Sequence, residues 1–145
     1  DVIIARAGFS RLVELKIYVN GELLSIYNAD GIIVSTPTGS TGYSLSAGGP
    51  IIFPQTDVMV ITPICPHSLQ ARSLVVSGED RIMIEIGKRR KTQKEEAMVT
   101  FDGRSAQELE TGDRIEIYKA QETTQLIRLK GRSFYQVLQN KIGTA

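Results

Sequence analysis

The sequence predicts a mostly β fold, similar to a β-sandwich, with one short helix in a glycine-rich loop and one C-terminal helix. Three observations predict it. Apolar residues recur with a period of two along most of the chain, turn-forming glycine, asparagine and proline residues separate these runs, and only two stretches have helical character. The 145 residues suffice for one domain with a substantial core, and no internal repeat or low-complexity tract interrupts them.

The first half of the chain predicts three strands. Apolar and polar residues alternate over Val13–Val19, and the Asn20-Gly21 pair after them is typical of a tight hairpin turn. The hairpin leads into a second strand over Glu22–Tyr27. Gly31 then reads as a turn into a short apolar strand, Ile32–Val34, which we expect to be buried.

The second half predicts further strands. Val58–Ile64 is apolar at nearly every position, so we expect both of its faces to be covered. Alternation returns at Ile82–Ile86, at Val99–Phe101 and at Ile115–Ile117. Leu126–Leu129 is predicted to form one more strand. Short strands separated by turns are typical of packed β-sheets.

Two segments are predicted to be helical. Residues 41–47 form a short one, whose hydroxyl-rich start would supply capping groups and direct backbone N–H groups at an anion or a ribose oxygen. Near the C-terminus, Ser133 and Gln136 have the spacing of a capping box. The apolar face of that second helix consists of Phe134, Val137 and Leu138.

Composition excludes several classes of function. The content of 41% hydrophobic and 23% charged residues is that of an ordinary globular protein, and the net charge of +1 gives no general attraction to nucleic acid or anionic membrane. The basic cluster Lys88–Lys94 reads as a solvated hairpin tip. Cys65 is the single cysteine and is predicted to be a small buried residue of a protein in a reducing compartment. His67 is the single histidine, which excludes a histidine-rich metal site.

The segment Asp30–Pro50, which reads DGIIVSTPTGSTGYSLSAGGP, carries the most chemical information. Its hydroxyl groups can donate and accept hydrogen bonds without adding charge, and its glycines allow a ligand to approach the backbone closely. Two interpretations are equally consistent with these residue types: a site for a ribose or a phosphate, or a glycine turn followed by a serine-capped helical turn.

This segment resembles the signature of the NAD kinase family, in which an Asp-Gly pair and an apolar run precede TPTGSTAYSLSAGGP; Gly42 stands where that pattern has alanine. Three other segments are similar to family motifs. Asp1–Ile4 resembles the acidic end of an Asn-Glu/Asp motif and its following strand, Thr62–Leu69 resembles a TPICPH segment, and Phe101–Arg104 resembles an FDGQ or FDGR turn. The resemblance therefore covers nearly the whole chain.

The resemblance implies a set of NAD-contacting residues. Tyr43 and Thr41 would hold the adenosine side, Asp30 the other end, and His67 would lie near the nicotinamide. Asp102 is interpreted as a turn residue beside the ligand-facing Arg104. The full implied set is Asp1, Arg11, Asn28, Asp30, Thr38, Thr41, Gly42, Tyr43, Ser44, Leu45, Ser46, His67 and Arg104.

The resemblance also implies the function of a cytoplasmic NAD kinase, which transfers a phosphoryl group from ATP or polyphosphate to the 2′-hydroxyl of the adenosine ribose of NAD and gives NADP. Residues 1–131 would form its NAD-binding domain, and residues 132–145 would pack on an N-terminal ATP-binding α/β domain. The family's GGDGT motif does not occur here, so we expect no catalytic residue in this chain. Base, Mg²⁺ and phosphoryl donor would come through that other domain. The resemblance further implies a homodimer or homotetramer formed through this domain, with NAD sites drawn from two subunits.

Two other functions stay open at the level of sequence. A lipid or sphingoid-base kinase would need an apolar acceptor pocket, whereas the loop from Thr38 to Ser46 is polar. A non-catalytic β-sandwich interaction module would bind no nucleotide. Neither nucleic acid nor membrane is an expected partner.

Overall fold

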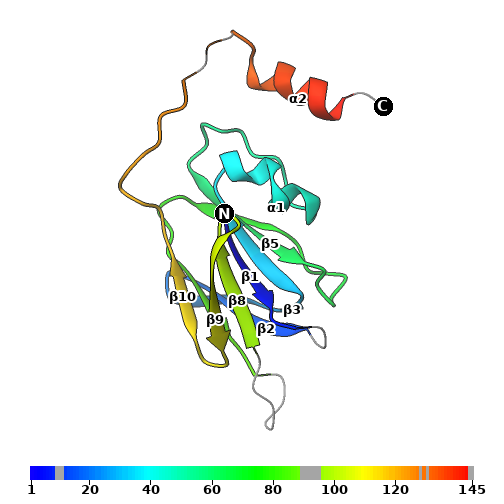
Figure 1. Ribbon diagram of the computed structural model, residues 1–145, viewed down its shortest axis with the longest axis vertical. Helices are drawn as coiled ribbons and strands as arrows, with labels where there is room; N and C mark the ends of the chain where they lie inside the picture. The colour runs from blue at the N-terminus through cyan, green and yellow to red at the C-terminus, as the bar shows by residue number, and fades with distance from the viewer. Residues whose placement is uncertain (9–11, 89–95, 128, 130, 144–145) are drawn as a thin grey trace.

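The computed structural model describes residues 1–8, 12–88, 96–127, 129 and 131–143 (Figure 1). Arg11 and most of the predicted basic hairpin tip, residues 89–95, lie outside these ranges. The described chain forms two antiparallel β-sheets, two short helical turns and one C-terminal helix. None of the described helices is both long enough and apolar enough to cross a lipid bilayer.

The larger sheet has six strands in the order β6-β5-β4-β1-β8-β9, and the smaller has four in the order β10-β7-β2-β3. The strands of the larger sheet are β1 (Val2–Arg6), β4 (Gly31–Ser35), β5 (Val58–Ile64), β6 (Leu74–Ser77), β8 (Glu96–Phe101) and β9 (Arg104–Glu110). Those of the smaller sheet are β2 (Val13–Val19), β3 (Glu22–Ala29), β7 (Ile82–Ile86) and β10 (Arg114–Ile117).

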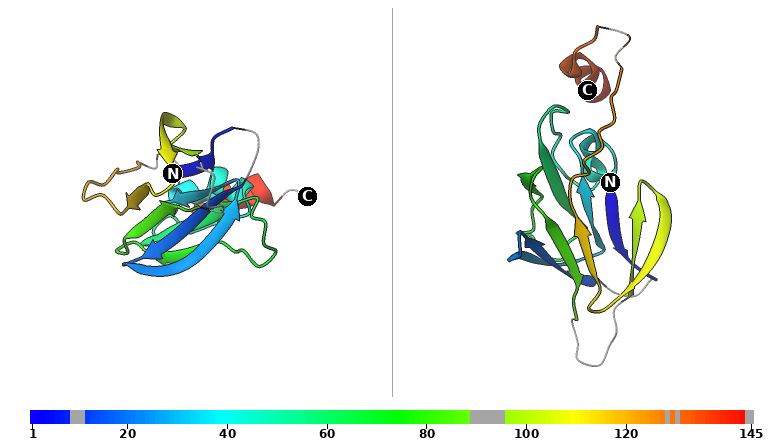
Figure 2. Two further views of the ribbon diagram at one scale, coloured as in Figure 1. Left: turned by 90° about the horizontal axis from the view of Figure 1, so that it is seen from below. Right: turned by 90° about the vertical axis from the view of Figure 1, so that its left-hand side faces the viewer.

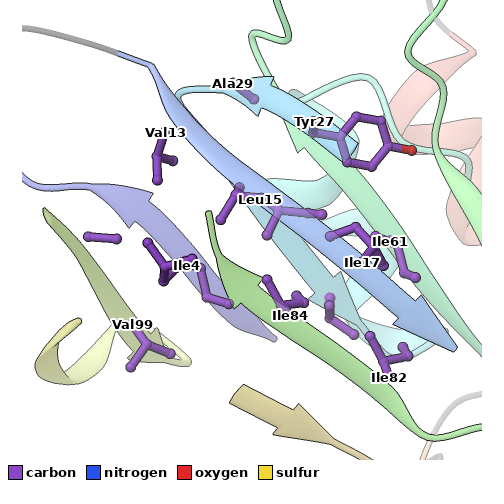
Figure 3. Close-up of a cluster of buried hydrophobic side chains, with 14 of the residues drawn as sticks. Ile4, Val13, Leu15, Ile17, Tyr27, Ala29, Ile61, Ile82, Ile84 and Val99 are labelled. Atoms are coloured by element: carbon purple, nitrogen blue, oxygen red, sulfur yellow. The ribbon is translucent and has the colours of Figure 1, made fainter. Parts of the chain in front are cut away.

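One hydrophobic core lies between the two sheets, as the predicted sandwich requires (Figures 2 and 3). The larger sheet contributes Ile4, Ile32 and Ile61, and the smaller sheet contributes Leu15 and Ile84. Each of these five side chains is fully buried. The period-two alternation therefore correctly predicted which residues of β2 and β7 face the interior, because successive side chains of a strand point to opposite faces.

Two hairpin turns follow directly from their residue types. Asn20 and Gly21 both have positive φ, at 50° and 83°, between β2 and β3, and Asp102 and Gly103 repeat this pattern, at 47° and 70°, between β8 and β9. Two consecutive residues with positive φ form the two-residue turn whose twist matches that of antiparallel strands, and Asn-Gly and Asp-Gly suit it best. The hairpin predicted at Asn20-Gly21 is confirmed, and Asp102 is a turn residue as interpreted.

The glycine-rich segment contains a 3₁₀ turn, η1 (Thr38–Thr41), followed by one helical turn, α1 (Tyr43–Ser46). A short helix in this loop was predicted, but the predicted side-chain cap at its start was wrong. The N-cap of α1 is Gly42, and no side chain caps it. The hydroxyl groups around it instead bond within the loop or point outward.

The C-terminal helix α2 (Phe134–Ile142) has the predicted capping box. The Ser133 hydroxyl accepts from the Gln136 backbone N–H, and the Gln136 side chain accepts from the Ser133 N–H. Its first turn contacts the loop before β5, where the Phe53 ring meets Phe134 edge-on at 5.4 Å and stacks on Tyr135 at 5.8 Å. No residue of α2 is buried.

Two predictions from the sequence were wrong. The described residues of the predicted strand, Leu126, Ile127 and Leu129, are not in a strand and are 74%, 85% and 92% exposed. They lie in the extended linker between β10 and α2 (Figure 1), and none of the described strands pairs with them. Cys65 is exposed rather than buried, and its φ of 44° places it in a tight turn after β5.

We expect Gly31→Ala to lower the free energy of unfolding by about 1–3 kcal/mol, the usual cost of overpacking. A Cβ at Gly31 would lie 2.5 Å from the Ile4 carbonyl oxygen and 3.0 Å from the Ala5 Cα, so β1 and β4 would have to separate. Urea unfolding of Gly131→Ala is the matched control, since nothing lies within 4 Å of a Cβ there. Equal stability of the two variants would contradict this view of the β1–β4 contact.

Candidate functional site

The glycine-rich loop begins directly at the end of β4 and is held by one buried serine. The Ser40 hydroxyl donates to the Pro37 carbonyl at 2.6 Å and accepts the Ile52 N–H at 3.0 Å. Ser40 is fully buried. Thr36 adds a bond, since its Oγ1 accepts the Gly39 N–H at 3.2 Å. These bonds join the two ends of the loop.

A second buried serine fixes α1 to the larger sheet. The Ser44 and Thr62 hydroxyls share a hydrogen bond of 2.9 Å, and both residues are fully buried. Gly49 packs against this pair: a Cβ there would lie 2.5 Å from Ser44 Oγ and 2.7 Å from Thr62 Oγ1. The second glycine of the Gly-Gly pair is therefore required by packing. Because the Ser44 hydroxyl is already bonded inside, its side chain supports the loop.

All but one of the remaining predicted residues of the loop are exposed. Thr38, Thr41, Gly42 and Ser46 are exposed, and Tyr43 is 46% exposed. Leu45 is partly buried. The loop thus presents hydroxyl groups and one phenol ring, on a backbone that buried bonds hold in place. Such a surface can hydrogen-bond sugar hydroxyls or phosphate oxygens and can stack on a base.

Asp1 and Arg104 lie at the same end of the larger sheet as this loop. In the antiparallel pairing, Val2 lies opposite Val34 and also opposite Phe101. The Asp102 backbone N–H donates to the Asp1 carbonyl at 3.0 Å, and Arg104 begins β9 immediately after that turn. Three segments that are distant in sequence therefore meet here.

A second group of predicted residues gathers at the opposite end of β4. The Asp30 carboxylate accepts from Arg6 Nε at 2.9 Å, an ion pair in which both side chains are about one-third exposed. The His67 backbone N–H donates to the Asn28 backbone carbonyl at 2.8 Å. The Asn28 side-chain oxygen, Oδ1, is buried and has no hydrogen-bond partner among the described residues. The second group therefore contains an oxygen atom that could accept a hydrogen bond from a ligand.

The length of β4 separates the two groups. Its five residues, at about 3.3 Å each, place them about 16 Å apart. Every residue from Gly31 to Ser35 is buried, so no open surface leads along the strand from one group to the other. The chain brings the predicted residues together as two clusters: Asp1, Arg104 and the loop in one, and Asn28, Asp30 and His67 in the other.

Three supporting residues were missed by sequence reasoning. The sequence analysis did not predict a supporting role for Arg6, which pairs with Asp30. It also did not predict one for Ser40 and Thr62, which hold the loop. Thr62 and Ser40 lie within the segments that resemble family motifs, so their positions could have indicated a role at the site. Arg6 gave no signal, because its contact with Asp30 depends on the pairing of β1 with β4.

The described residues hold no obvious metal centre. No three histidine, cysteine, aspartate or glutamate side chains lie together among them in a way that could hold a metal ion.

Comparison with known proteins gives consistent matches. The sequence profile of the ATP-NAD kinase C-terminal domain matches residues 1–129. The NAD kinase of Lachnoclostridium phytofermentans is 54% identical over 143 residues, which cover 99% of this chain and 50% of that protein. The NAD kinase of Agathobacter rectalis is 49% identical, with the same coverage. The chain thus spans about half the length of these relatives.

Two solved structures are similar in fold as well as in sequence. Yeast NADH kinase complexed with NADH has a TM-score of 0.73 and 38% identity, with 81% of this chain and 33% of that chain covered. An NAD kinase from Archaeoglobus fulgidus in complex with ATP has a TM-score of 0.72 and 29% identity, with 83% and 44% covered.

Ser44→Ala should lower the free energy of unfolding by about 1–3 kcal/mol, because it leaves the buried Thr62 hydroxyl without a partner. Adding Thr62→Val removes both partners, so the double variant should lose less than the sum of the single losses. Ser46→Ala, at an exposed position of the same turn, is the control and should change stability by less than about 0.5 kcal/mol. Strict additivity in thermal or urea unfolding would show that the two hydroxyls do not interact.

Proposed function

The chain belongs to the family of ATP-NAD kinase C-terminal domains, and from this premise we propose that it is the NAD-binding part of an NAD kinase. That enzyme moves a phosphoryl group from ATP or polyphosphate to the 2′-hydroxyl of the adenosine ribose of NAD, and NADP is the product. The observation that carries the proposal is the rigid, outward-facing hydroxyl surface of the loop, in a chain that is 54% identical to a named NAD kinase.

In this proposal the loop binds the adenosine side of NAD. The exposed Tyr43 ring supplies stacking area, and the Thr41 hydroxyl a hydrogen bond. Asp1 and Arg104, at the same end of the sheet, complete this half. Phosphoryl transfer depends mainly on positioning and on charge stabilisation, so a substrate hydroxyl held by a rigid loop is the contribution expected of this domain.

The Asp30 cluster is assigned to the other end of the dinucleotide. The ion pair with Arg6 orients the Asp30 carboxylate, and a carboxylate can accept several hydrogen bonds. It can therefore accept from ribose hydroxyls or from an amide group. The buried Asn28 side-chain oxygen would gain a partner in the same step, and the His67 backbone is held to the Asn28 backbone carbonyl.

The catalytic base and the divalent cation are assigned to the part of the enzyme outside this chain. Mg²⁺ bound with ATP or polyphosphate would neutralise charge on the transferring phosphoryl group. In this proposal the described residues bind and orient NAD, and the cation is held outside them. We place the enzyme in the cytoplasm, where its exposed Cys65 thiol would stay reduced.

We further propose that two copies share each NAD site. The loop cluster and the Asp30 cluster of one chain lie about 16 Å apart across a buried strand. A homodimer or homotetramer can bring the loop of one subunit next to Asp30 of another. Oligomerisation would then be part of substrate binding.

The chain 1–145 alone should form no NADP from NAD and ATP, because base and donor site are assigned elsewhere. A longer protein with the length of its relatives should be active. A coupled assay for NADP measures both, and calorimetry with NAD shows whether the inactive chain still binds substrate. Turnover by residues 1–145 would contradict this division between the two parts.

Asp30→Ala and Tyr43→Ala in the longer protein should each weaken NAD binding by about 1–3 kcal/mol, because each removes a contact to the buried ligand. If two subunits share each site, equal mixing of the two variants should return about a quarter of all sites to the unmodified affinity, because each mixed dimer holds one site with both Tyr43 and Asp30. Ser25→Ala, between the hairpin and Asn28, is the control variant and should bind NAD like the unmodified protein. Absence of recovery after subunit exchange would overturn the shared site, whereas unchanged kinetics in both single variants would overturn the site itself.

A further inference from the structure

The segment that joins α1 to β5 is tied to the glycine-rich loop at one backbone group. Residues 50–57 of this segment form neither helix nor strand. Within it, the Ile52 N–H donates to the Ser40 hydroxyl at 3.0 Å, and that hydroxyl donates to the Pro37 carbonyl at 2.6 Å, at the start of η1. The position of the first turn of the loop therefore depends on where Ile52 lies.

Three aromatic rings hold the residue that follows Ile52. The Phe53 ring meets Phe134 edge-on at a centroid distance of 5.4 Å and stacks on Tyr135 at 5.8 Å. Phe134 and Tyr135 also meet each other at 5.8 Å. Ring pairs at these separations attract each other in addition to burying apolar area. Because these two residues begin α2, the start of the helix lies on this segment, at one end of the molecule (Figures 1 and 2).

The helix α2 depends on this contact in turn. A helix of nine residues is marginal by itself in water, and no residue of α2 is buried. The aromatic contacts that the described part of α2 makes with the rest of the chain go to Phe53. Since each partner orders the other, loss of the Phe53 ring would release both the helix and the segment that carries Ile52.

This contact lies outside the hydrophobic core. Neither Phe53 nor any residue of α2 belongs to the core cluster between the two sheets. Phe53 is 37% exposed, so its removal leaves no cavity inside the sandwich. We therefore expect a change at Phe53 to act on the loop and on α2, and to leave the two sheets folded.

We propose that Phe53 is a positioning residue for NAD. The start of α2 holds its ring, Ile52 is thereby held against Ser40, and the exposed face of the loop keeps the geometry that the dinucleotide requires. This inference rests on the proposed function, in which Thr41 and Tyr43 contact the adenosine side of NAD. In it Phe53 acts through the loop and does not touch the substrate.

Hydrogen exchange of the longer protein without ligand tests whether α2 holds the loop. Phe53→Ala should speed exchange of the hydrogen-bonded N–H groups of Ser40 and Gly42 at least about fivefold, while exchange in β2 and β7 stays the same. Phe134→Ala removes the same ring contact from the side of the helix and should have the same effect. The double variant should then add little to either single variant, because the contact is already lost. Phe53→Tyr keeps the ring and should behave like the unmodified protein.

Calorimetry and steady-state kinetics on the same variants test the effect on NAD. Phe53→Ala and Phe134→Ala should weaken NAD binding and raise the KM for NAD at least about fivefold, because the loop is displaced. The KM for ATP should stay the same, since ATP is assigned to the other domain. Loss of folded protein would instead lower kcat and leave both KM values unchanged.

Ile142→Ala is the matched control. Ile142 is an apolar residue of the same helix, is 53% exposed, and lies about 12 Å along the helix axis from Phe134. Its removal should change neither exchange in the loop nor NAD affinity. Equal effects of Ile142→Ala and Phe134→Ala would mean that α2 acts through another surface, which contradicts the role of Phe53.

Two further results would overturn the inference. Unchanged loop exchange in Phe53→Ala or in Phe134→Ala would show that α2 does not hold the loop, and faster exchange with unchanged NAD affinity would show that this hold does not matter for binding. If Phe53→Ala fails to fold, Phe134→Ala decides between these results. Failure of the inference alone leaves NAD binding by the unmodified protein intact, whereas absence of that binding overturns the proposed function and, with it, the role of Phe53.

Discussion

The burial of β4 is the constraint on which the rest of the structure depends. This strand pairs with β1 on one side and β5 on the other, and each of its five residues is buried. Asp30 precedes β4 and the glycine-rich loop follows it. The position of β4 therefore determines where both clusters of predicted ligand residues lie. Gly31 allows the close approach to β1 that this position requires.

The loop shows how a polar segment can be rigid. The buried hydroxyls of Ser40 and Ser44 form hydrogen bonds with Pro37, Ile52 and Thr62. These bonds hold the backbone of the exposed residues between the two serines in place. In an enzyme that works mainly by positioning, a displacement of about 1 Å can cost about a hundredfold in rate. In the proposed function the buried serines would contribute by holding the loop, without facing the ligand.

Much of the fold could be predicted from sequence because its signals are local. Period-two alternation identified β2 and β7, Asn20-Gly21 identified a hairpin, and Ser133 with Gln136 identified the start of α2. The strand predicted at Leu126–Leu129 failed because a strand needs a neighbour, which local pattern does not reveal. The residues of the candidate site stay a prediction from the sequence motifs. Which hydroxyls turn inward, and the separation of Asp30 from the loop, depend on packing between distant segments and could not be predicted.

The central claim is that two clusters separated by a buried strand act on one NAD molecule. Amide chemical shifts recorded while NAD is added to the full-length protein test it most directly. The account predicts shifts at exposed loop positions such as Thr41 and Tyr43 and also around Asp30 and His67, with both sets saturating at the same NAD concentration. Shifts at only one cluster, or saturation at two different concentrations, would contradict it.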